Sequence, residues 1–439
     1  MKKILVMASW MAALPAVAQT PAPPALPTPP VPFNVDFAAI TEGLPIDSRP
    51  TEKAGDKPLF PQQTRAPYHK SMSYTATILT STLQAPWALA VLPDNKLLVN
   101  ERLPGTFRII DQNGVTSAPL TGLSGLTTMP KLGLLDIAID PQFSRNHRFF
   151  FTYFGWDDKT VGAVCIASAV LDEKTGAITG LKTIFRAAPL LPNDQNLAMG
   201  TKTGGRIAIG KDGYLYVTIG DRDNAGPKPW GVAQILDTHL GKTIRITKEG
   251  KPAPGNPFLK TPGALPEIWN YGQRSQEGLA FNPADGSLWE TEHGARGGDE
   301  LNMMQAGKNY GWPLVTHGID YARQPVNDGA SSKPGLEEPA YYWSPSMAPA
   351  GLAFYQGDLF PAWKGSIFVP MLRGKSLVRL QLASGKVVAE EPLLTELNAR
   401  IRDVRVGPDG AVYVLTDSGG SAISDNTPPT SKLVKLTPK

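Results

Sequence analysis

A short pattern recurs along most of this chain: an apolar segment, a turn of Pro, Asp, Asn and Gly residues, and often a second apolar segment. The turn residues tolerate tight backbone geometry and the flanking segments favour strands, so each unit predicts a β-hairpin or part of one. The units occupy residues 89–100, 107–114, 137–153, 207–219, 279–290 and 404–416. Almost no helical period separates them. Recurrence at such intervals is typical of radially repeated sheets, so the sequence predicts an all-β fold, a six-bladed β-propeller over residues 74–439.

A pair of stacked β-sandwiches is the alternative fold, and the repeated turn chemistry favours the propeller. The composition agrees with many short strands, because the 439 residues include 43 Gly and 42 Pro. The net charge is only +4, with both signs mixed along the chain. Since no basic block marks a nucleic-acid surface, no nucleic-acid partner is expected.

The first 73 residues differ from the repeated region. Two lysines at the start, an apolar run over 4–17 and a small-residue site ending at Ala18 predict a secretory signal peptide over residues 1–18. The run is too short to cross a membrane and no later segment reaches that length, so no membrane span is expected. Residues 19–73 are predicted to be a Pro-rich N-terminal extension, most dense in proline up to Pro32. The mature protein is therefore expected in the periplasm or outside the cell.

Several common chemistries are not indicated. The five histidines, at positions 69, 147, 239, 293 and 317, lack the spacing of zinc ligands. No Gly-rich phosphate loop and no nucleophile-elbow serine motif occurs. The single cysteine, Cys165, lies in an apolar run, which predicts a packing role and excludes an internal disulfide.

Three stretches, 270–281, 289–300 and 398–404, carry polar residues at predicted strand edges. In a propeller such positions line one end of the central channel. Arg400 and Arg402 are two residues apart, so on an extended chain both side chains point the same way. Two guanidiniums on one face favour an anion with several carboxylates, although a solvated strand face is the simpler alternative.

From about residue 80 to the C-terminus the chain resembles the soluble glucose/sorbosone dehydrogenases that depend on pyrroloquinoline quinone (PQQ), especially their aldose sugar dehydrogenase branch. Eight phrases in the family's order carry the resemblance: Pro86–Ala90, Gly133–Pro141, Gly204–Arg206, Leu240–Arg245, Glu292–Glu300, Asn309–Pro313, Pro345–Pro349 and Arg400–Val404. The family's six-bladed propeller agrees with the repeated hairpins.

The resemblance implies a cofactor site at one end of the channel. PQQ carries three carboxylates, and the positions that match its contacts are Arg274, His293, Arg373, Arg400 and Arg402. Backbone carbonyls at Gly294 and Ala295 match those that hold a Ca²⁺ ion, a cation that prefers oxygen ligands.

The chain departs from the family at three positions. Lys202 stands where the family has its catalytic histidine, Lys131 stands where it has a glutamine, and Ser275 stands where it has an asparagine. An unperturbed lysine is protonated at neutral pH and cannot act as a base. Lys202 is therefore either a base whose pKa is lowered by burial and nearby arginines, or it binds an anionic cofactor or substrate together with Lys131.

Two hypotheses about function follow. The first is an exported quinoprotein dehydrogenase that oxidises a sugar, a sorbosone-like aldehyde or a related hydroxylated substrate, with PQQ as hydride acceptor and a respiratory electron acceptor. The second is a non-catalytic propeller that binds an anionic or carbohydrate ligand. The arginines favour the first hypothesis, and Lys202 favours the second.

Overall fold

The computed structural model describes residues 34–102, 105–128, 133–157, 161–192, 202–222, 231–418 and 429–439. The predicted signal peptide, most of the proline-dense segment and Lys131 lie outside these ranges. No helix among the described residues is long and apolar enough to cross a membrane.

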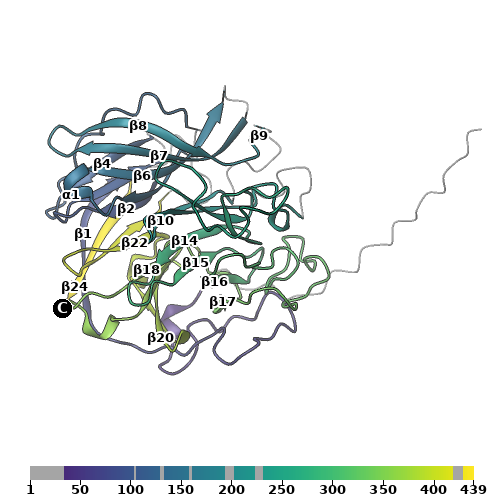
Figure 1. Ribbon diagram of the computed structural model, residues 1–439. Coiled ribbons are helices and arrows are strands. Elements are labelled where there is room, and N and C mark those ends of the chain that lie inside the picture. The colour runs from purple at the N-terminus through teal and green to yellow at the C-terminus, as the bar shows by residue number, and fades with distance from the viewer. Residues whose placement is uncertain are drawn as a thin grey trace, which may run out of the picture.

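Six antiparallel sheets form the blades of a propeller, which confirms the predicted fold (Figure 1). Blade 1 contains β2 (Pro86–Val91), β3 (Leu97–Glu101) and β4 (Thr106–Ile110). Blade 2 contains β5 (Leu134–Ile139), β6 (Arg148–Asp157), β7 (Val161–Asp172), β8 (Ala177–Arg186) and β9 (Leu191–Pro192). Blade 3 contains β10 (Gly204–Ile209), β11 (Leu215–Ile219), β12 (Lys242–Ile246) and β13 (Ile268–Tyr271). Blade 4 contains β14 (Gln276–Phe281), β15 (Leu288–Glu292), β16 (Asp299–Met304) and β17 (Tyr341–Trp343). Blade 5 contains β18 (Ala353–Phe354), β19 (Ile367–Met371), β20 (Ser376–Ala383) and β21 (Lys386–Leu393). Blade 6 contains β22 (Ile401–Val406), β23 (Val412–Thr416), β24 (Ser431–Pro438) and β1 (Tyr74–Leu83).

Helical elements are short and lie between strands or before them. They are η1 (Phe37–Ala39), α1 (Phe143–Asn146), η2 (Val232–Gln234), η3 (Pro361–Trp363) and η4 (Thr395–Leu397). The predicted hairpin around Lys211–Gly213 is present as β10 and β11, and Gly213 has a φ of 82°, a backbone angle that glycine adopts without strain.

Apolar clusters between neighbouring blades hold the ring together. Phe150 of blade 2 packs in one cluster with Val217 of blade 3, and Val99 of blade 1 packs in another with Leu415 of blade 6. Cys165 is fully buried in the cluster between blades 1 and 2, in agreement with its predicted packing role. The hydrophobic core is thus divided among the blade interfaces, and the channel in the middle is left for polar residues.

The two ends of the described chain close the ring. β1 pairs antiparallel with β24, from Tyr74 opposite Pro438 to Leu83 opposite Ser431, so the last blade combines strands from both ends of the sequence (Figure 1). Blade 6 then contacts blade 1 through β2 and β22. This pairing covers an edge that an open ring would expose.

A buried charge cluster crosses the channel between the first strands of three blades. Arg206 on β10 lies 2.9 Å from Asp403 on β22 and 3.4 Å from Asp136 on β5, measured between guanidinium nitrogen and carboxylate oxygen. Arg405 lies 2.7 Å from each carboxylate. The Arg206 guanidinium also lies 4.0 Å from the ring centre of Trp87. Two arginines between two carboxylates balance the charge, so the cluster ties blades 2, 3 and 6 together without an uncompensated ion.

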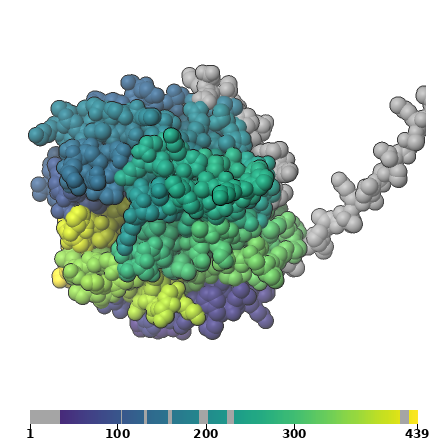
Figure 2. Space-filling model, in the orientation of Figure 1, coloured from purple at the N-terminus to yellow at the C-terminus, as the bar shows by residue number. Residues whose placement is uncertain are grey.

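Residues 34–73, which we call the N-terminal strap, lie against blades 4 and 5 (Figure 2). The strap follows an irregular path after η1, and individual polar contacts hold it. The Gln63 side chain donates to the Pro339 carbonyl at 3.0 Å, and the Gln63 backbone carbonyl accepts from the Tyr342 amide at 2.8 Å. Ala66 donates to the Tyr341 hydroxyl at 2.9 Å. The strap is therefore part of the folded surface beside these blades.

A buried ion pair between Asp56 of the strap and His317 provides a pH-dependent attachment. The His317 Nδ1 lies 3.0 Å from an Asp56 carboxylate oxygen, and the imidazole stacks on Tyr342 at a centroid distance of 3.8 Å. Burial alone lowers the pKa of His317, but the hydrogen bond to Asp56 and the Glu338 carboxylate 3.9 Å from its Nε2 raise it to about 9 from its ordinary 6.5. Burial raises the pKa of Asp56, but the hydrogen bond and positive charge of His317, together with a hydrogen bond from Ser331, hold it below its ordinary value.

We expect the strap attachment to weaken at alkaline pH. A raised folded-state pKa stabilises the folded protein fully below pH 6.5, and that contribution is lost as pH rises through about 9. Thermal unfolding from pH 6.5 to 9.5 should therefore show a larger fall in Tm for the parent protein than for His317→Gln. Equal pH slopes for the two proteins would contradict the role of this pair.

Candidate functional site

Strand direction brings the candidate residues to one end of the channel. In an antiparallel pair, the start of a blade's first strand lies beside the end of its second strand, as Gln276 pairs with Glu292 and Ile401 with Thr416. The residues just before a first strand and just after a second strand therefore meet at the same end. Most of the residues described below occupy these positions: Arg102, Lys202, Asp221, Arg274, His293, Arg373, Arg400 and Asp417.

Three arginines and two carboxylates form one group at this end, built mainly from blades 1 and 6. Arg402 donates to Asp417 at 2.8 Å and lies 3.7 Å from Glu277. The Nε of Arg400 lies 3.9 Å from the same Asp417 carboxylate, so both arginines extend toward one point, as their spacing predicts. Burial and the charge of Arg402 lower the pKa of Arg102 to about 9, which places Arg102 beside this pair.

Electrostatic balance in this group leaves room for further negative charge. Burial by itself raises the pKa of Asp417, but the guanidiniums of Arg402 and Arg102 hold it below its ordinary value. Burial and Arg402 also lower the pKa of Arg400. Three guanidiniums thus face two carboxylates, and their mutual repulsion favours an additional anion.

Several buried guanidinium N–H groups of the arginines at this end make no hydrogen bond to the described residues. Among the described residues, no hydrogen-bond partner exists for Nε and one Nη of Arg102, or for the Nε atoms of Arg400, Arg402 and Arg274. Buried donors are nearly always paired in folded proteins, so several unpaired ones at one end of a channel need an explanation. Carboxylates are the acceptors that guanidiniums bind most strongly. The donor set therefore fits a ligand with several carboxylates, such as PQQ.

Arg274 joins this group to the loop after β15. Its Nη1 donates to the carbonyls of His293 and Gly294, at 3.0 and 2.5 Å, and its guanidinium lies 5.1 Å from the ring centre of Trp312. The next residue, Ser275, donates its hydroxyl to Glu277 at 3.3 Å. Since Glu277 also lies beside Arg402, the two parts of the site meet at Ser275.

His293 lies on the inner side of the loop, with its backbone N–H bonded to the Ser275 carbonyl at 2.9 Å. Its Nε2 donates to the Pro349 carbonyl at 2.7 Å. The residue is therefore beside Arg274 and away from the outer rim of blade 4. Its role as a cofactor contact stays a prediction.

Lys202 lies two residues before β10, in a left-handed conformation with a φ of 49°. Its ammonium is 4.0 Å from a carboxylate oxygen of Asp221, the second residue after β11. The other Asp221 oxygen accepts from the Trp312 indole at 2.7 Å, and the Asp221 amide donates to the Arg274 carbonyl at 2.8 Å. Lys202 thus contacts Asp221, and Asp221 is in turn fixed by Trp312 and the backbone of Arg274. A buried carboxylate at this distance stabilises the charged ammonium.

Arg373 reaches the site end from blade 5, two residues after β19. Burial lowers the pKa of Arg373, and so does the positive charge of Arg49 in the N-terminal strap. Its backbone N–H donates to the Met347 carbonyl at 3.1 Å. The neighbouring charges Glu52 and Arg296 also act on Arg373, so the strap borders this part of the site.

Asp299, which sequence reasoning did not single out, fixes the loop that carries Gly294 and Ala295. One carboxylate oxygen accepts from the Gly294 amide at 3.0 Å. The other accepts from the Ser346 hydroxyl and from the amides of Met347 and Ala348, at 2.7 to 2.8 Å. Asp299 therefore joins the loop after β15 to the segment that positions Arg373.

We expect Asp299→Asn to destabilise the protein by about 2 kcal/mol, because the amide N–H₂ would face buried donors. Denaturant unfolding measures this change. Asp285→Asn is the matched control, since Asp285 also accepts backbone and hydroxyl hydrogen bonds but lies in the exposed β14–β15 turn. An equal effect at both positions would contradict a special role for Asp299.

The predicted Ca²⁺ site at the carbonyls of Gly294 and Ala295 stays a prediction. The Gly294 carbonyl already accepts from Arg274, whose positive charge opposes a cation at the same oxygen. Among the described residues, no group of three His, Cys, Asp or Glu side chains is placed to hold a metal ion. Lys131, predicted as a second basic cofactor contact, lies outside the described residues.

Comparison with known proteins identifies a family and several relatives. The family model "Glucose / Sorbosone dehydrogenase" matches residues 83–424. "Aldose sugar dehydrogenase YliI" of Escherichia coli (strain K12) is 37% identical over 352 residues, which cover 80% of this chain and 92% of that protein. "Quinoprotein glucose dehydrogenase B" of Acinetobacter calcoaceticus is 25% identical over 461 residues, which cover 86% and 92%.

Solved structures are similar along most of the chain. The apo-form of the soluble aldose sugar dehydrogenase from Escherichia coli has a TM-score of 0.75 at 36% identity and covers 84% of this chain and 100% of its own. The PQQ-bound form of aldose sugar dehydrogenase from Streptomyces coelicolor has a TM-score of 0.65 at 27% identity and covers 84% and 99%. Since the family model spans most of the propeller, this protein belongs to the glucose/sorbosone dehydrogenase family.

Proposed function

We propose that this protein is an exported dehydrogenase that uses PQQ to oxidise a sugar or a related aldehyde. The observation that supports PQQ is the set of buried guanidinium N–H groups on Arg102, Arg400, Arg402 and Arg274 that lack a hydrogen-bond partner among the described residues, at one end of the channel. A ligand with three carboxylates can satisfy several of these donors at once. Lys131 is proposed as a further basic contact, from its place in the sequence.

The chain's own residues would bind and orient both reactants. When bound, PQQ supplies the electrophilic quinone that takes up a hydride from the sugar. Arg102, Arg400 and Arg402 would hold its carboxylates, and Arg274 would supply a positive charge beside the loop at His293. The predicted Ca²⁺ would lie beside the Gly294 carbonyl, which already accepts from Arg274. A loss of PQQ affinity on adding EGTA would support the ion, and an unchanged affinity would remove it from this scheme.

The proton of the oxidised hydroxyl needs an acceptor, and we assign this role to Asp221. In this proposal Lys202 acts as a hydrogen-bond donor 4.0 Å from Asp221, and the Asp221 carboxylate takes the proton. Lys202 then donates a hydrogen bond that orients the substrate hydroxyl toward Asp221. This assignment replaces the family's histidine with a lysine–carboxylate pair.

The Lys202–Asp221 pair also gives a reason for the second hypothesis, a propeller that binds an anionic or carbohydrate ligand without oxidising it. The two functions separate in one experiment. The protein is titrated with PQQ, followed by the cofactor's absorbance, and the loaded protein is then assayed for reduction of an artificial dye with a panel of aldoses. Binding with dye reduction supports the dehydrogenase, and binding without reduction by any sugar supports the second hypothesis.

The location and the acceptor follow from the same proposal. The predicted signal peptide over residues 1–18 would deliver the chain to the periplasm or outside the cell. A respiratory electron acceptor would then reoxidise the cofactor there. Secretion of a fusion that carries residues 1–33 tests the first statement, and retention of that fusion in the cytoplasm would contradict it.

A further inference from the structure

We propose that a pocket between the N-terminal strap and the loop 319–329 binds a second sugar ring, the one attached to the ring that is oxidised. The inference rests on the proposed function, since the site end would bind the first ring. It assigns the strap a role in choosing between monosaccharides and longer saccharides.

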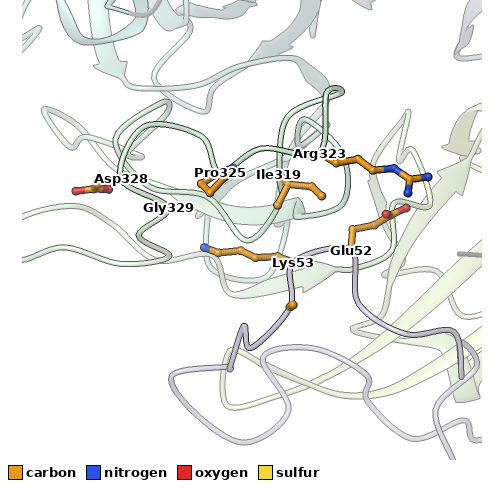
Figure 3. Close-up of a pocket in the computed structure, with 8 residues that line it drawn as sticks. Glu52, Lys53, Ile319, Arg323, Pro325, Asp328 and Gly329 are labelled. Carbon is orange, nitrogen blue, oxygen red and sulfur yellow. The ribbon is translucent and has the colours of Figure 1, made fainter. Parts of the chain in front are cut away.

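The pocket has a volume of about 200 Å³, and residues of the strap and the loop face each other across it (Figure 3). Its wall carries the charged side chains of Glu52, Lys53, Arg323 and Asp328. Ile319 and Pro325 add an apolar part. Hydrogen-bonding groups around an apolar surface suit a sugar ring, which presents hydroxyls at its edge and C–H groups on its face.

The charges of the wall favour a neutral ligand. Two carboxylates and two cations line the pocket, so neither an anion nor a cation is preferred. Lys53 already donates to the Thr316 carbonyl and the Ser331 hydroxyl, at 2.8 and 2.5 Å, and Asp328 pairs with Lys333 at 2.7 Å. A neutral polyhydroxyl compound can bind without breaking these pairs.

The pocket adjoins the loop that carries Gly294 and Ala295. Glu52 accepts from the Nε of Arg296 at 3.0 Å, and a Cβ atom on Gly297 would lie only 3.2 Å from the Glu52 Cβ. On the opposite wall, the Ile319 amide donates to the Arg296 carbonyl at 3.2 Å. Both walls therefore attach to Arg296, the residue after Ala295.

The loop 319–329 also reaches the cofactor side of the site. Tyr321, two residues after Ile319, lies on this loop with its hydroxyl 3.4 Å from an Nη of Arg274. One loop thus borders both Arg274 and the pocket, and we infer that a ligand extending from the site end follows this loop to the pocket. The strap precedes the residues that the family model matches, which begin at residue 83. The pocket is consequently built in part from a segment outside the matched propeller.

The test uses glycosides that cannot be oxidised at the anomeric carbon, so binding is measured apart from turnover. Calorimetric titration of the PQQ-loaded protein with methyl β-maltoside and methyl β-glucoside should show about tenfold tighter binding of the maltoside, from a few added hydrogen bonds. Ala54→Trp should fill the pocket from an exposed position of the strap and remove this difference. Arg323→Ala should reduce it.

Ala284→Trp is the matched control, because Ala284 is exposed in the β14–β15 turn at the opposite end of blade 4. Equal binding of both glycosides by the parent, or a preference that Ala54→Trp leaves unchanged, would overturn the subsite. Strap-dependent binding in a protein that no sugar reduces would support the subsite and refute the dehydrogenase. Sugar oxidation with no strap-dependent preference would support the dehydrogenase and refute the subsite.

Discussion

Arg402→Ala is expected to weaken PQQ binding by about tenfold to a hundredfold, which corresponds to the 1.5–3 kcal/mol of a hydrogen bond between charged groups. Arg402 and Arg400 extend toward the same Asp417 carboxylate and carry buried Nε atoms without hydrogen-bond partners among the described residues. Arg400→Ala should have a similar effect, and the double variant should bind PQQ only at much higher concentration. Absorbance titration of each purified variant measures the Kd.

The control is Arg145→Ala, in the last turn of α1 and exposed, at the end of blade 2 that faces away from the site. Its PQQ affinity should equal that of the parent. Salt should weaken binding in the parent more than in the double variant, since fewer ion pairs remain to be screened. If both single variants bind PQQ as the parent does, the channel end is not the cofactor site.

Asp221→Asn is expected to lower the rate of reduction of bound PQQ by about a hundredfold or more, the usual contribution of a general base. Lys202→Ala should have a comparable effect, because the substrate hydroxyl would lose its orienting donor. Lys202→Arg should retain most of the rate, since the charge remains beside Asp221. All three variants should bind PQQ normally. Single-turnover reduction by excess aldose, followed by absorbance across pH, measures these rates.

The pH profiles separate Asp221 from Lys202 as the base. If Lys202 is the base, Lys202→Arg loses activity as Lys202→Ala does, and Asp221→Asn moves the parent's profile to lower pH because a carboxylate no longer stabilises the ammonium. If the parent binds PQQ but oxidises no sugar and Lys202→His restores turnover, this substitution has removed the family's chemistry. Equal rates for Lys202→Ala and the parent at every pH would exclude both roles.

The fold could be predicted because its determinants are local. Each turn of Pro, Asp and Gly residues lies beside two strand-forming segments, and the same chemistry recurs in blade after blade, so a few residues specify each hairpin. The predicted location of the basic residues has the same origin. Arg400 and Arg402 flank the start of β22, and their common direction follows from the two-residue period of a strand.

The rest of the site depends on contacts between distant segments. Asp299 acts through hydrogen bonds from residues 346–348, and no sequence pattern near Asp299 predicts a contact with that segment. The strap packs through single polar groups such as Gln63 and Asp56, which leave no periodic signal. Arg102 and Asp221 could have been predicted from the sequence, because each lies one or two residues after the second strand of its blade, where the other site residues also occur.

The pairing of β1 with β24 has a consequence for when the protein can acquire its cofactor. The residues that would hold PQQ come from blades 1, 4, 5 and 6, and Arg102 meets Arg402 only where the first blade adjoins the last. A ring that has not closed lacks the contact between Arg102 and Arg402, so cofactor loading is expected to follow ring closure during folding.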